Sequence, residues 1–320
     1  MSEIAVIGAG AWGTALAIQA ARAGRTVTLW ARDPVNAAAI EQTRLNPRLP
    51  DIRLPGAIRV TAHLPAHADA ILLAVPMQHL RHMAERMPPS DAPVVVCAKG
   101  VEAGTLRLPL EILAEIRPAQ PAYVLTGPNF AREVAEGMPA AATLAGADAA
   151  VRDRIVGLLA TASFRLYGND DAIGAQVGGA AKNVIAIAAG AVIGAGLGEN
   201  ARAALITRSL TELSRLTIAL GGRAETVMGL SGLGDLLLTC TGPSSRNFSL
   251  GLALGRGETL ADILAARDAV TEGVATGPAL VARAAGVDMP ICAAVAALLA
   301  GRTTLTRAMG DLLARPRRDE

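Results

Sequence analysis

The sequence predicts two domains, an α/β domain with a mostly parallel sheet over residues 1–170 and an all-helical domain over residues 171–320. In the first half, short apolar runs alternate with helical patterns, which is typical of parallel strands joined by crossover helices. Beyond Asp171 the strand patterns stop, and helical periodicity continues with breaks at glycine pairs and prolines. A chain of 320 residues is long enough to bury a core in each domain.

The composition excludes one class of partner. Hydrophobic residues make up 52% of the chain and aromatic residues only 2%, which argues against single-stranded nucleic acid held by stacking on rings. The formal charge of +2 is close to neutral, and the short basic tract at residues 315–318 is followed by Asp319-Glu320. We therefore expect no nucleic-acid partner.

The cysteines and the apolar runs indicate the compartment. Cys97, Cys240 and Cys292 are widely spaced and form no CxxC pair, so we expect neither a zinc site nor a disulfide framework. The four histidines lie on unremarkable segments, and we expect no metal. No signal-peptide pattern precedes the first strand, and the uncharged run at 184–198 is too short and too rich in glycine for a membrane span. We expect a cytoplasmic protein without membrane insertion.

A glycine-rich turn opens the first domain. Gly8-Ala9-Gly10-Ala11-Trp12-Gly13 lies between an apolar strand at 4–7 and a helix at 14–23, and a second strand follows at 26–30. Gly8 permits a tight turn, Gly10 lets a pyrophosphate approach the backbone, and Gly13 lets helix and strand pack. The N–H groups at the helix N-terminus would bind the pyrophosphate. An ordinary tight turn is the alternative, but this strand–turn–helix context favours a dinucleotide site.

The end of the second strand bears on the choice of cofactor. Asp33-Pro34 predicts a helix N-cap followed by the first helical residue. Arg32 is suited to a 2′-phosphate, although a solvated arginine or one stacked on adenine is equally consistent. The sequence favours NADP and leaves the choice between NADP and NAD open.

Further polar groups follow the later strands. We expect an irregular connection over 44–60, strands at 69–76, 93–98, 122–125, 140–145 and 164–167, and a helix at 149–162. Lys99 comes directly after one strand, and the turn with Gly127 and Asn129 follows another. Ligands of open α/β sheets bind at the carboxyl ends of the strands, although a lysine there is often only a surface residue.

Lys182 stands alone in an apolar helical run, GAQVGGAAKNVIAI. An ammonium in such a run must be paired, solvated in a cleft or used in chemistry, because burying it unpaired is costly. Gly178 and Gly179 lie one turn earlier and cost about 1 kcal/mol each in a helix. Two explanations stay open for these glycines, clearance for a ligand and close helix packing.

A polar cluster occurs later in the helical half. Asp235 follows a Gly-x-Gly and is also a plausible first-turn residue of a helix. Arg246-Asn247 offers several donors to an oxyanion such as phosphate, although a lone arginine is more often a surface residue.

Taken together, these segments resemble the NAD(P)-dependent glycerol-3-phosphate dehydrogenases of bacterial type over essentially the whole chain. The matching motifs are GAGAWGTALA, VTLWARD, AKG, GPNFA, GGAAKNVIAIAAG, NARAALITR, GLGDLLLTC, SRN and VTEG. The resemblance implies reversible reduction of dihydroxyacetone phosphate by NADPH or NADH to sn-glycerol 3-phosphate, which supplies glycerophospholipid synthesis. It also implies a Rossmann-like domain followed by an all-helical domain of the 6-phosphogluconate dehydrogenase type.

The resemblance assigns roles to individual positions. Lys182 corresponds to the residue that donates and accepts the proton. The cofactor-binding set is Gly8, Gly10, Ala11, Trp12, Gly13, Arg32, Lys99, Ala131, Arg246, Val270 and Glu272. The substrate-binding set is Lys99, Gly127, Asn129, Lys182, Asp235, Ser245, Arg246 and Asn247.

The chain departs from the family pattern at two positions, and two other functions stay open. Ala11 replaces a frequent serine and loses a hydroxyl, and Asn129 replaces serine or threonine. A β-hydroxy-acid dehydrogenase of the same superfamily would share the glycine turn and the lysine helix. A non-catalytic dinucleotide sensor would have no need for Lys99, Lys182 and Asp235 together. Oligomeric state, including a homodimer, and feedback by ligands stay open.

Overall fold

The computed structural model describes residues 2–267 and 271–316. The chain forms two compact units, the first made of residues 1–99 and 108–176 and the second of residues 100–107 and 177–320. Among the described residues, all strands lie in the first unit, and the regular elements of the second unit are helices. The fold class therefore agrees with the prediction.

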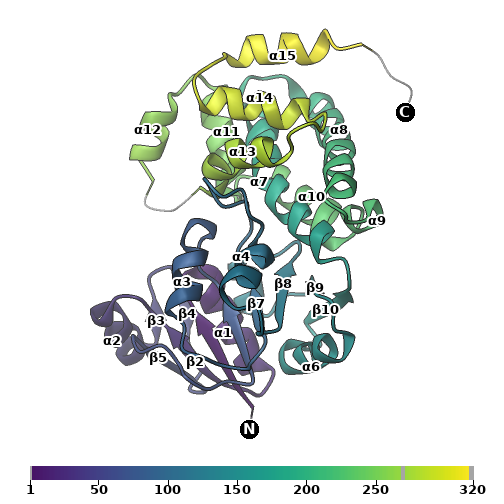
Figure 1. Cartoon of the computed structure of the whole chain (residues 1–320). Coiled ribbons are helices and arrows are strands. Elements are labelled where there is room, and N and C mark those ends of the chain that lie inside the picture. The colour runs from purple at the N-terminus through teal and green to yellow at the C-terminus, as the bar shows by residue number, and fades with distance from the viewer. Residues whose placement is uncertain (1, 268–270, 317–320) are drawn as a thin grey trace. The chain divides into compact units, whose positions relative to one another are not determined.

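The first unit contains an eight-stranded sheet in the order β10-β9-β8-β7-β6-β1-β2-β5 (Figure 1). Neighbouring strands are parallel except β8 and β9, which are antiparallel. The strands are β1 (Glu3–Ile7), β2 (Thr26–Trp30), β5 (Ile58–Thr61), β6 (Ala70–Leu73), β7 (Val94–Val96), β8 (Ala122–Thr126), β9 (Ala140–Ala145) and β10 (Phe164–Asn169). The helices are α1 (Ala11–Arg22), α2 (Pro34–Thr43), α3 (Leu80–Arg86), α4 (Pro109–Ile116), α5 (Ala131–Glu136) and α6 (Ala149–Leu159), with a short 3₁₀ turn, η1 (Met77–His79).

The central strands are apolar on both faces. In β1, Ile4 and Val6 belong to one buried cluster, whereas Ala5 and Ile7 belong to another. Successive side chains of a strand point to opposite faces, so the sheet has a core on each side. This explains why the strands read as continuous apolar runs.

The prediction of an irregular connection over residues 44–60 was wrong. This segment forms a hairpin of β3 (Leu45–Asn46) and β4 (Leu49–Arg53), and it continues into β5 at the edge of the main sheet. Prolines at 47, 50 and 55 interrupt the alternation that marks a strand, and these strands are only two to five residues long.

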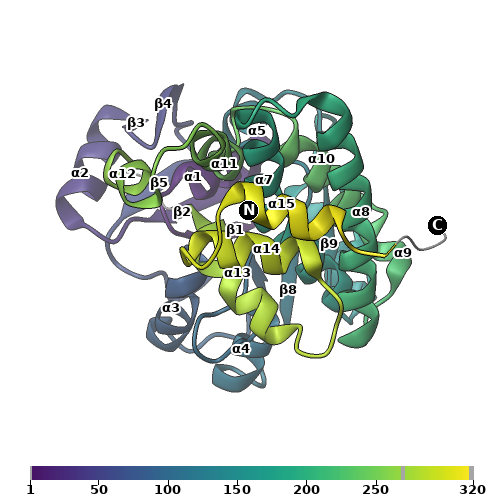
Figure 2. The ribbon, with the colours of Figure 1, turned by 90° about the horizontal axis from the view of Figure 1, so that it is seen from above.

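The second unit consists of helices and one π-helical turn. They are α7 (Ala172–Gly194, which begins in the first unit), α8 (Gly198–Ala219), α9 (Ala224–Val227), η2 (Leu230–Gly234), α10 (Asp235–Cys240), α11 (Arg246–Gly255), α12 (Leu260–Ala265), α13 (Glu272–Arg283), α14 (Pro290–Leu299) and α15 (Leu305–Leu313). Figure 2 shows α13, α14 and α15 grouped together.

Helices α7 and α11 cross at glycines. A methyl group at Gly190 would overlap the carbonyl oxygen of Phe248, and one at Gly251 would overlap that of Ile187. The bare backbones therefore approach closely at this crossing. Within the described residues, α7 is the one helix long and apolar enough to cross a membrane, and 83% of its most apolar window is buried inside the protein. This burial is typical of a core helix, as predicted for residues 184–198.

Candidate active site

The glycine-rich turn between β1 and α1 has three glycines in three different environments. Gly8 has φ of +117°, and a Cβ there would lie 2.5 Å from the carbonyl oxygen of Ala74. A Cβ at Gly13 would overlap the carbonyl oxygen of Gly8, whereas a Cβ at Gly10 would meet nothing within 4 Å. Gly8 and Gly13 are thus required by the fold itself, and the space beside Gly10 is open.

The N-terminus of α1 presents backbone N–H groups. The N-cap is Gly10, which has no side chain to cap the helix, and the first intrahelical bond runs from the N–H of Thr14 to the oxygen of Gly10 at 2.9 Å. The amides of Ala11 and Trp12 precede this bond, where a helix leaves its N–H groups without intrahelical partners. Such amides bind anions, so this turn fits the pyrophosphate of a dinucleotide.

The residues after β2 divide into a cap and an exposed cation. The carboxylate of Asp33 accepts hydrogen bonds from the N–H groups of Val35 at 3.1 Å and Asn36 at 3.4 Å, and Pro34 is the first residue of α2. The predicted cap is confirmed. Arg32 is exposed just after the end of the strand.

Three predicted residues gather near the ends of β7 and β8. Lys99 donates from Nζ to the carbonyl oxygen of Gly127 at 3.2 Å, and Gly127 has φ of +142°. Asn129 donates from Nδ2 to the oxygen of Ala141 at 3.1 Å. The Oδ1 atom of Asn129 and the hydroxyl of Thr126 are buried and have no hydrogen-bond partner within the described part of the chain. Buried polar atoms without partners are rare and call for an explanation; a bound ligand is one. Ala131 begins α5 nearby in the sequence.

In the second unit, Lys182 forms an ion pair with Asp235. The Nζ–Oδ1 distance is 2.5 Å, and the exposed fractions of the two side chains are 11% and 0%. Thr239, one turn further along α10, donates its hydroxyl to the backbone oxygen of Asp235 at 2.6 Å and lies 3.4 Å from Oδ1. The lysine of the apolar helix is therefore paired, and its partner comes from 53 residues later in the chain.

Gly178 serves helix packing. A Cβ at this position would lie 2.5 Å from the carbonyl oxygen of Ser231 and 3.0 Å from the Cα of Gly232, both in η2. The backbone of η2 occupies the space that ligand clearance would need. Of the two explanations left open by the sequence, packing therefore holds for Gly178.

Cys240 ends α10 close to the ion pair. It is fully buried, and burial raises the pKa of its thiol from about 9.0 to about 12, although the nearby Lys182 acts in the opposite direction. A neutral buried thiol is a poor nucleophile. Cys240 is therefore a packing residue beside Lys182 and Asp235.

The N-terminus of α11 carries the remaining predicted cluster. Ser245 is its N-cap, and its hydroxyl accepts from the N–H of Phe248 at 3.2 Å. Arg246 is exposed. Asn247 is buried; its Nδ2 donates to Oδ1 of Asn183 at 2.9 Å, and its Oδ1 accepts from the N–H of Gly273 at 3.0 Å.

The remaining predicted positions, Glu272 and Val270, are two residues apart in the sequence. Glu272 is the first residue of α13. Val270 lies outside the described residues.

The sequence held one signal that was not used, and the structure adds one residue that was not predicted. The chain has only two lysines, Lys99 and Lys182, among its 30 basic residues, and both occupy candidate positions. Because nearly all other basic residues are arginines, this rarity alone indicates Lys99 and Lys182 as candidate functional residues, without any sequence motif. Asn46, which contacts the glycine-rich turn, was not predicted, and no spacing singles it out.

Comparison with known proteins identifies the family. The family described as "NAD-dependent glycerol-3-phosphate dehydrogenase N-terminus" matches residues 3–152, and the corresponding C-terminus family matches residues 171–310. The chain is 59% identical over 323 residues to the glycerol-3-phosphate dehydrogenase [NAD(P)+] of Acidiphilium cryptum, covering 99% of this chain and 98% of the relative. It is 55% identical to the protein of that name in Gluconobacter oxydans, with 98% and 97% covered.

A solved structure agrees with these relatives. The crystal structure of glycerol-3-phosphate dehydrogenase from Coxiella burnetii superposes with a TM-score of 0.93 at 36% identity, covering 98% of this chain and 99% of the other. The chain belongs to the NAD-dependent glycerol-3-phosphate dehydrogenase family.

Proposed function

We propose that this protein reversibly reduces dihydroxyacetone phosphate to sn-glycerol 3-phosphate with a nicotinamide cofactor, and so supplies glycerophospholipid synthesis. The observation that carries the proposal is the Lys182–Asp235 ion pair, a short, nearly buried contact of 2.5 Å in a member of this family. A buried cation beside a fixed carboxylate is suited to proton transfer and to stabilising negative charge.

The first unit would bind the cofactor, which supplies the hydride when bound. The open space beside Gly10 and the N–H groups of Ala11 and Trp12 fit a pyrophosphate. Arg32 would contact a 2′-phosphate, and we propose NADPH as the preferred cofactor on this ground. The proposed cofactor set also includes Lys99, Ala131, Arg246, Val270 and Glu272.

Lys182 would act on the carbonyl oxygen of the substrate. When a ketone accepts a hydride, negative charge develops on that oxygen, and the ammonium stabilises it and donates the proton. Asp235 holds Nζ in one position, and Thr239 donates its hydroxyl to the backbone oxygen of Asp235. In the reverse direction the amine of Lys182 accepts the proton from the alcohol.

The N-terminus of α11 would bind the phosphate of the substrate. Arg246 supplies a charged fork of donors. The hydroxyl of Ser245 keeps its hydrogen, because its oxygen is the acceptor in the cap. Asn247 keeps one N–H beyond the bond to Asn183. Lys99, Gly127 and Asn129 complete the proposed substrate set.

Replacing Lys182 tests the proposal. We expect Lys182→Ala to lower kcat by about 10²–10⁴-fold and added primary amine to restore part of the rate. Lys182→Arg keeps the charge but cannot release a proton at neutral pH, so it should also be slow. Cofactor affinity without substrate and the melting temperature report folding. A correctly folded Lys182→Ala enzyme whose kcat is within about tenfold of the wild-type value would exclude the proton-transfer role.

The phosphate site and the rival activities have separate tests. Arg246→Ala should raise KM for dihydroxyacetone phosphate, and an unchanged KM would mean that the phosphate binds elsewhere.

Oxidation of NADPH or NADH with dihydroxyacetone phosphate, but not with a 3-oxo acid, would exclude a β-hydroxy-acid dehydrogenase. Cofactor binding without turnover of any carbonyl substrate would instead indicate a sensor.

We also propose a cytoplasmic homodimer that needs no metal. The buried, unpaired cysteines suit a reducing compartment.

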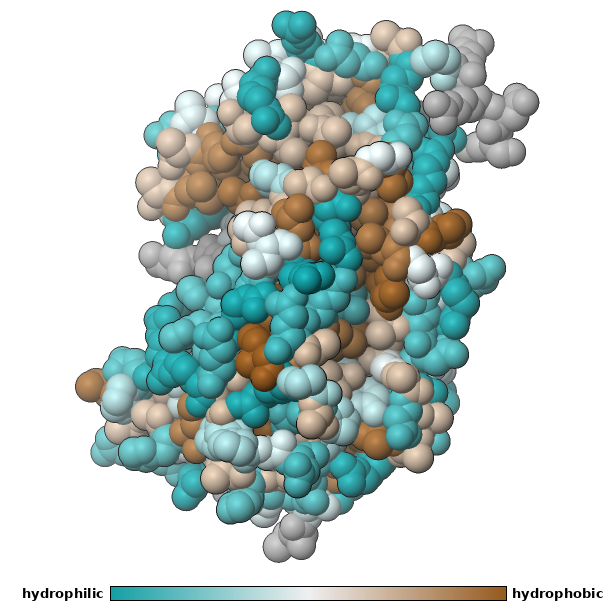
Figure 3. Space-filling model, viewed as in Figure 1, coloured by the Kyte–Doolittle hydropathy of each residue, from teal (hydrophilic) through white to brown (hydrophobic). Residues whose placement is uncertain are grey.

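Several large hydrophobic side chains of the second unit are exposed, and Figure 3 shows hydrophobic surface gathered on part of that unit. They are Leu197, Ile218, Met228, Leu237, Leu264 and Leu313. Sedimentation at a monomer mass across the working concentrations would overturn the dimer, and activity unchanged by chelation would support the absence of a metal.

A further inference from the structure

Asn46 is a buried side chain that connects the β3–β4 hairpin to the glycine-rich turn. It is 1% exposed. Its Nδ2 atom donates to the carbonyl oxygen of Ala9 at 3.0 Å and to Oγ1 of Thr14 at 2.7 Å. Its Oδ1 atom accepts from the N–H of Arg48 at 3.0 Å. Because a carbonyl oxygen can only accept, the contact with Ala9 determines which way the amide of Asn46 is turned.

The contact with Ala9 orients the next peptide N–H. Ala9 precedes the N-cap Gly10, so its carbonyl lies outside the helical bonding of α1, which begins with the bond from Thr14 to Gly10. The peptide between Ala9 and Gly10 is trans, and because a peptide group is planar its C=O and N–H point in opposite directions. With the C=O held by Asn46, the N–H of Gly10 points away from the hairpin.

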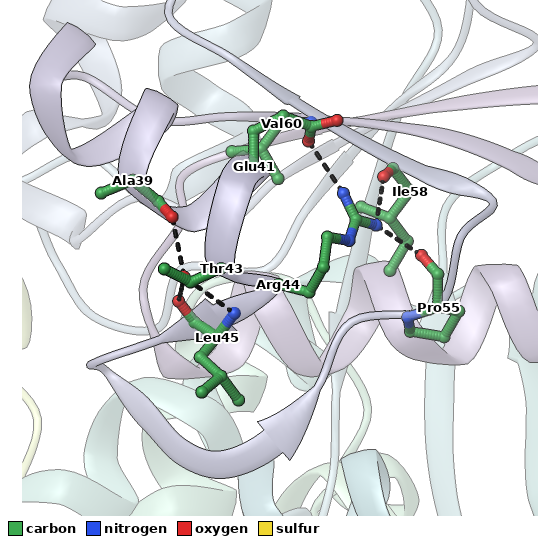
Figure 4. A network of polar contacts seen from close by, with 8 residues as sticks. All are labelled: Ala39, Glu41, Thr43, Arg44, Leu45, Pro55, Ile58 and Val60. Carbon is green, nitrogen blue, oxygen red and sulfur yellow. Dashed lines mark hydrogen bonds and ion pairs between the residues drawn. The ribbon is translucent and has the colours of Figure 1, made fainter.

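The hairpin that carries Asn46 is itself braced (Figure 4). The guanidinium of Arg44 donates to the carbonyl oxygens of Pro55 and Ile58, both at 2.6 Å, and pairs with Glu41 at 2.9 Å. Glu41 also accepts from the N–H of Val60 at 2.6 Å. These bonds tie the end of α2 to β5 on either side of the hairpin, so Asn46 is held on a fixed support.

We propose that Asn46 is a positioning residue for dinucleotide binding. It acts through the Ala9–Gly10 peptide and the hydroxyl of Thr14, and it keeps the amide of Gly10 and the first turn of α1 aligned for the pyrophosphate before the cofactor arrives. Alignment before binding raises affinity because less freedom is lost on association. The inference rests on the proposed function, since it assumes that this turn binds a dinucleotide.

The same unit contains a matched control. Gln19 is also 1% exposed, and its Nε2 donates to the carbonyl oxygen of Leu159 at 2.9 Å and to Oγ1 of Thr161 at 3.0 Å. Both amides thus hold one backbone carbonyl and one threonine hydroxyl. Gln19, however, lies two turns further along α1 and holds the end of α6, not the glycine-rich turn.

The experiment compares Asn46→Asp with Gln19→Glu, and Asn46→Ala with Gln19→Ala. The dissociation constants of NADPH and NADH are measured by calorimetry on the full chain without substrate, together with the melting temperature and with kcat and KM for dihydroxyacetone phosphate. Both pairs should lower the melting temperature. We expect the Asn46 variants to weaken cofactor binding about tenfold or more, with kcat at saturating cofactor within about threefold of wild type, and the Gln19 variants to keep wild-type affinity.

The outcomes separate the inference from the proposed function. Equal losses of affinity in each pair, or wild-type affinity in both folded Asn46 variants, would overturn the positioning role alone. If Asn46→Asp fails to fold, the neutral Ala pair decides. If neither Asn46 variant folds while both Gln19 variants do, Asn46 is a folding residue and the inference fails. A wild-type chain that binds neither cofactor would overturn the proposed function as well.

Discussion

The two candidate sites of this protein are built from different parts of the chain. The glycine-rich turn of the first unit consists of backbone, with Gly8, Gly10 and Gly13 keeping side chains away from it. The site in the second unit consists of side chains, where Lys182 and Asp235 face each other in almost complete burial. Substitutions that add side-chain atoms should therefore disrupt the glycine-rich turn, whereas substitutions that remove a charge should disrupt the Lys182–Asp235 site.

This difference explains why one site can be recognised from a local pattern in the sequence and the other cannot. A backbone site needs glycine at fixed spacing along one segment, so it leaves a local pattern in the sequence. A side-chain pair needs only two residues that meet in the folded protein, and these two are 53 positions apart. We therefore expect the loss of a buried charge to cost more stability than an added methyl group.

Removing the carboxylate partner should be the most damaging change. Asp235→Ala leaves the ammonium of Lys182 buried without this partner, and breaking a buried pair costs about 3–5 kcal/mol. Asp288→Ala is the control in the same unit, because the Asp288–Arg315 pair is exposed by 37% and 40% and such pairs contribute about 0–1 kcal/mol. Urea unfolding measures both, and equal effects would contradict the assignment of Lys182–Asp235 as a buried ion pair.

Adding a methyl group to the turn should damage the first unit. At Gly13 the new Cβ would overlap the carbonyl oxygen of Gly8, and overpacking costs about 1–3 kcal/mol or more. We expect Gly13→Ala to lower the melting temperature and to abolish measurable cofactor binding. A Gly13→Ala protein with wild-type stability would show that the turn can move aside.

Gly178 gives the corresponding test in the second unit. Gly178→Ala should destabilise the protein by about 1–3 kcal/mol, because its methyl group would press on the backbone of Ser231. Gly157, in α6, has nothing within 4 Å of its Cβ position, so Gly157→Ala should be stabilising by up to about 1 kcal/mol. Stabilisation by Gly178→Ala would reopen ligand clearance as the reason for this glycine.

Gly10 should separate binding from folding. Its backbone, with φ of −74° and ψ of 176°, is accessible to alanine, and the space beside it is open. We expect Gly10→Ala to cost no more than about 1 kcal/mol of stability, the difference between glycine and alanine at an N-cap, and to raise KM for the cofactor about tenfold or more. An unchanged cofactor KM would place the pyrophosphate elsewhere.

The thiol beside the ion pair should give the smallest effect. With the pKa of Cys240 raised by burial to about 12, about 10⁻⁴ of it is thiolate at pH 8, so disulfide reagents should label it only after unfolding. Because the pKa is higher in the folded protein than in the unfolded chain, the contribution of this thiol to stability is full below pH 9 and falls as the pH rises further. Labelling of Cys240 in the native enzyme within minutes would contradict this.

The sequence predicted the α/β half followed by the helical half, the strands of the main sheet except β5, the glycine-rich turn, the cap at Asp33, the family, and the two lysines as candidates. These depend on local patterns: an apolar run, a glycine spacing, an aspartate before a proline. It did not reveal the strands between residues 44 and 60, because prolines interrupt short strands that only the sheet stabilises.

Which residues meet depends on the tertiary fold. It paired Lys182 with Asp235, assigned Gly178 to packing against η2, and brought Asn46 to the carbonyl of Ala9. Each of these contacts joins residues more than 30 positions apart, and its energy depends on burial and distance, which no local pattern records. In the sequence, Lys182 stands out as a charge within an apolar run. The fold places the carboxylate of Asp235 beside it, and this ion pair compensates for the burial of the ammonium.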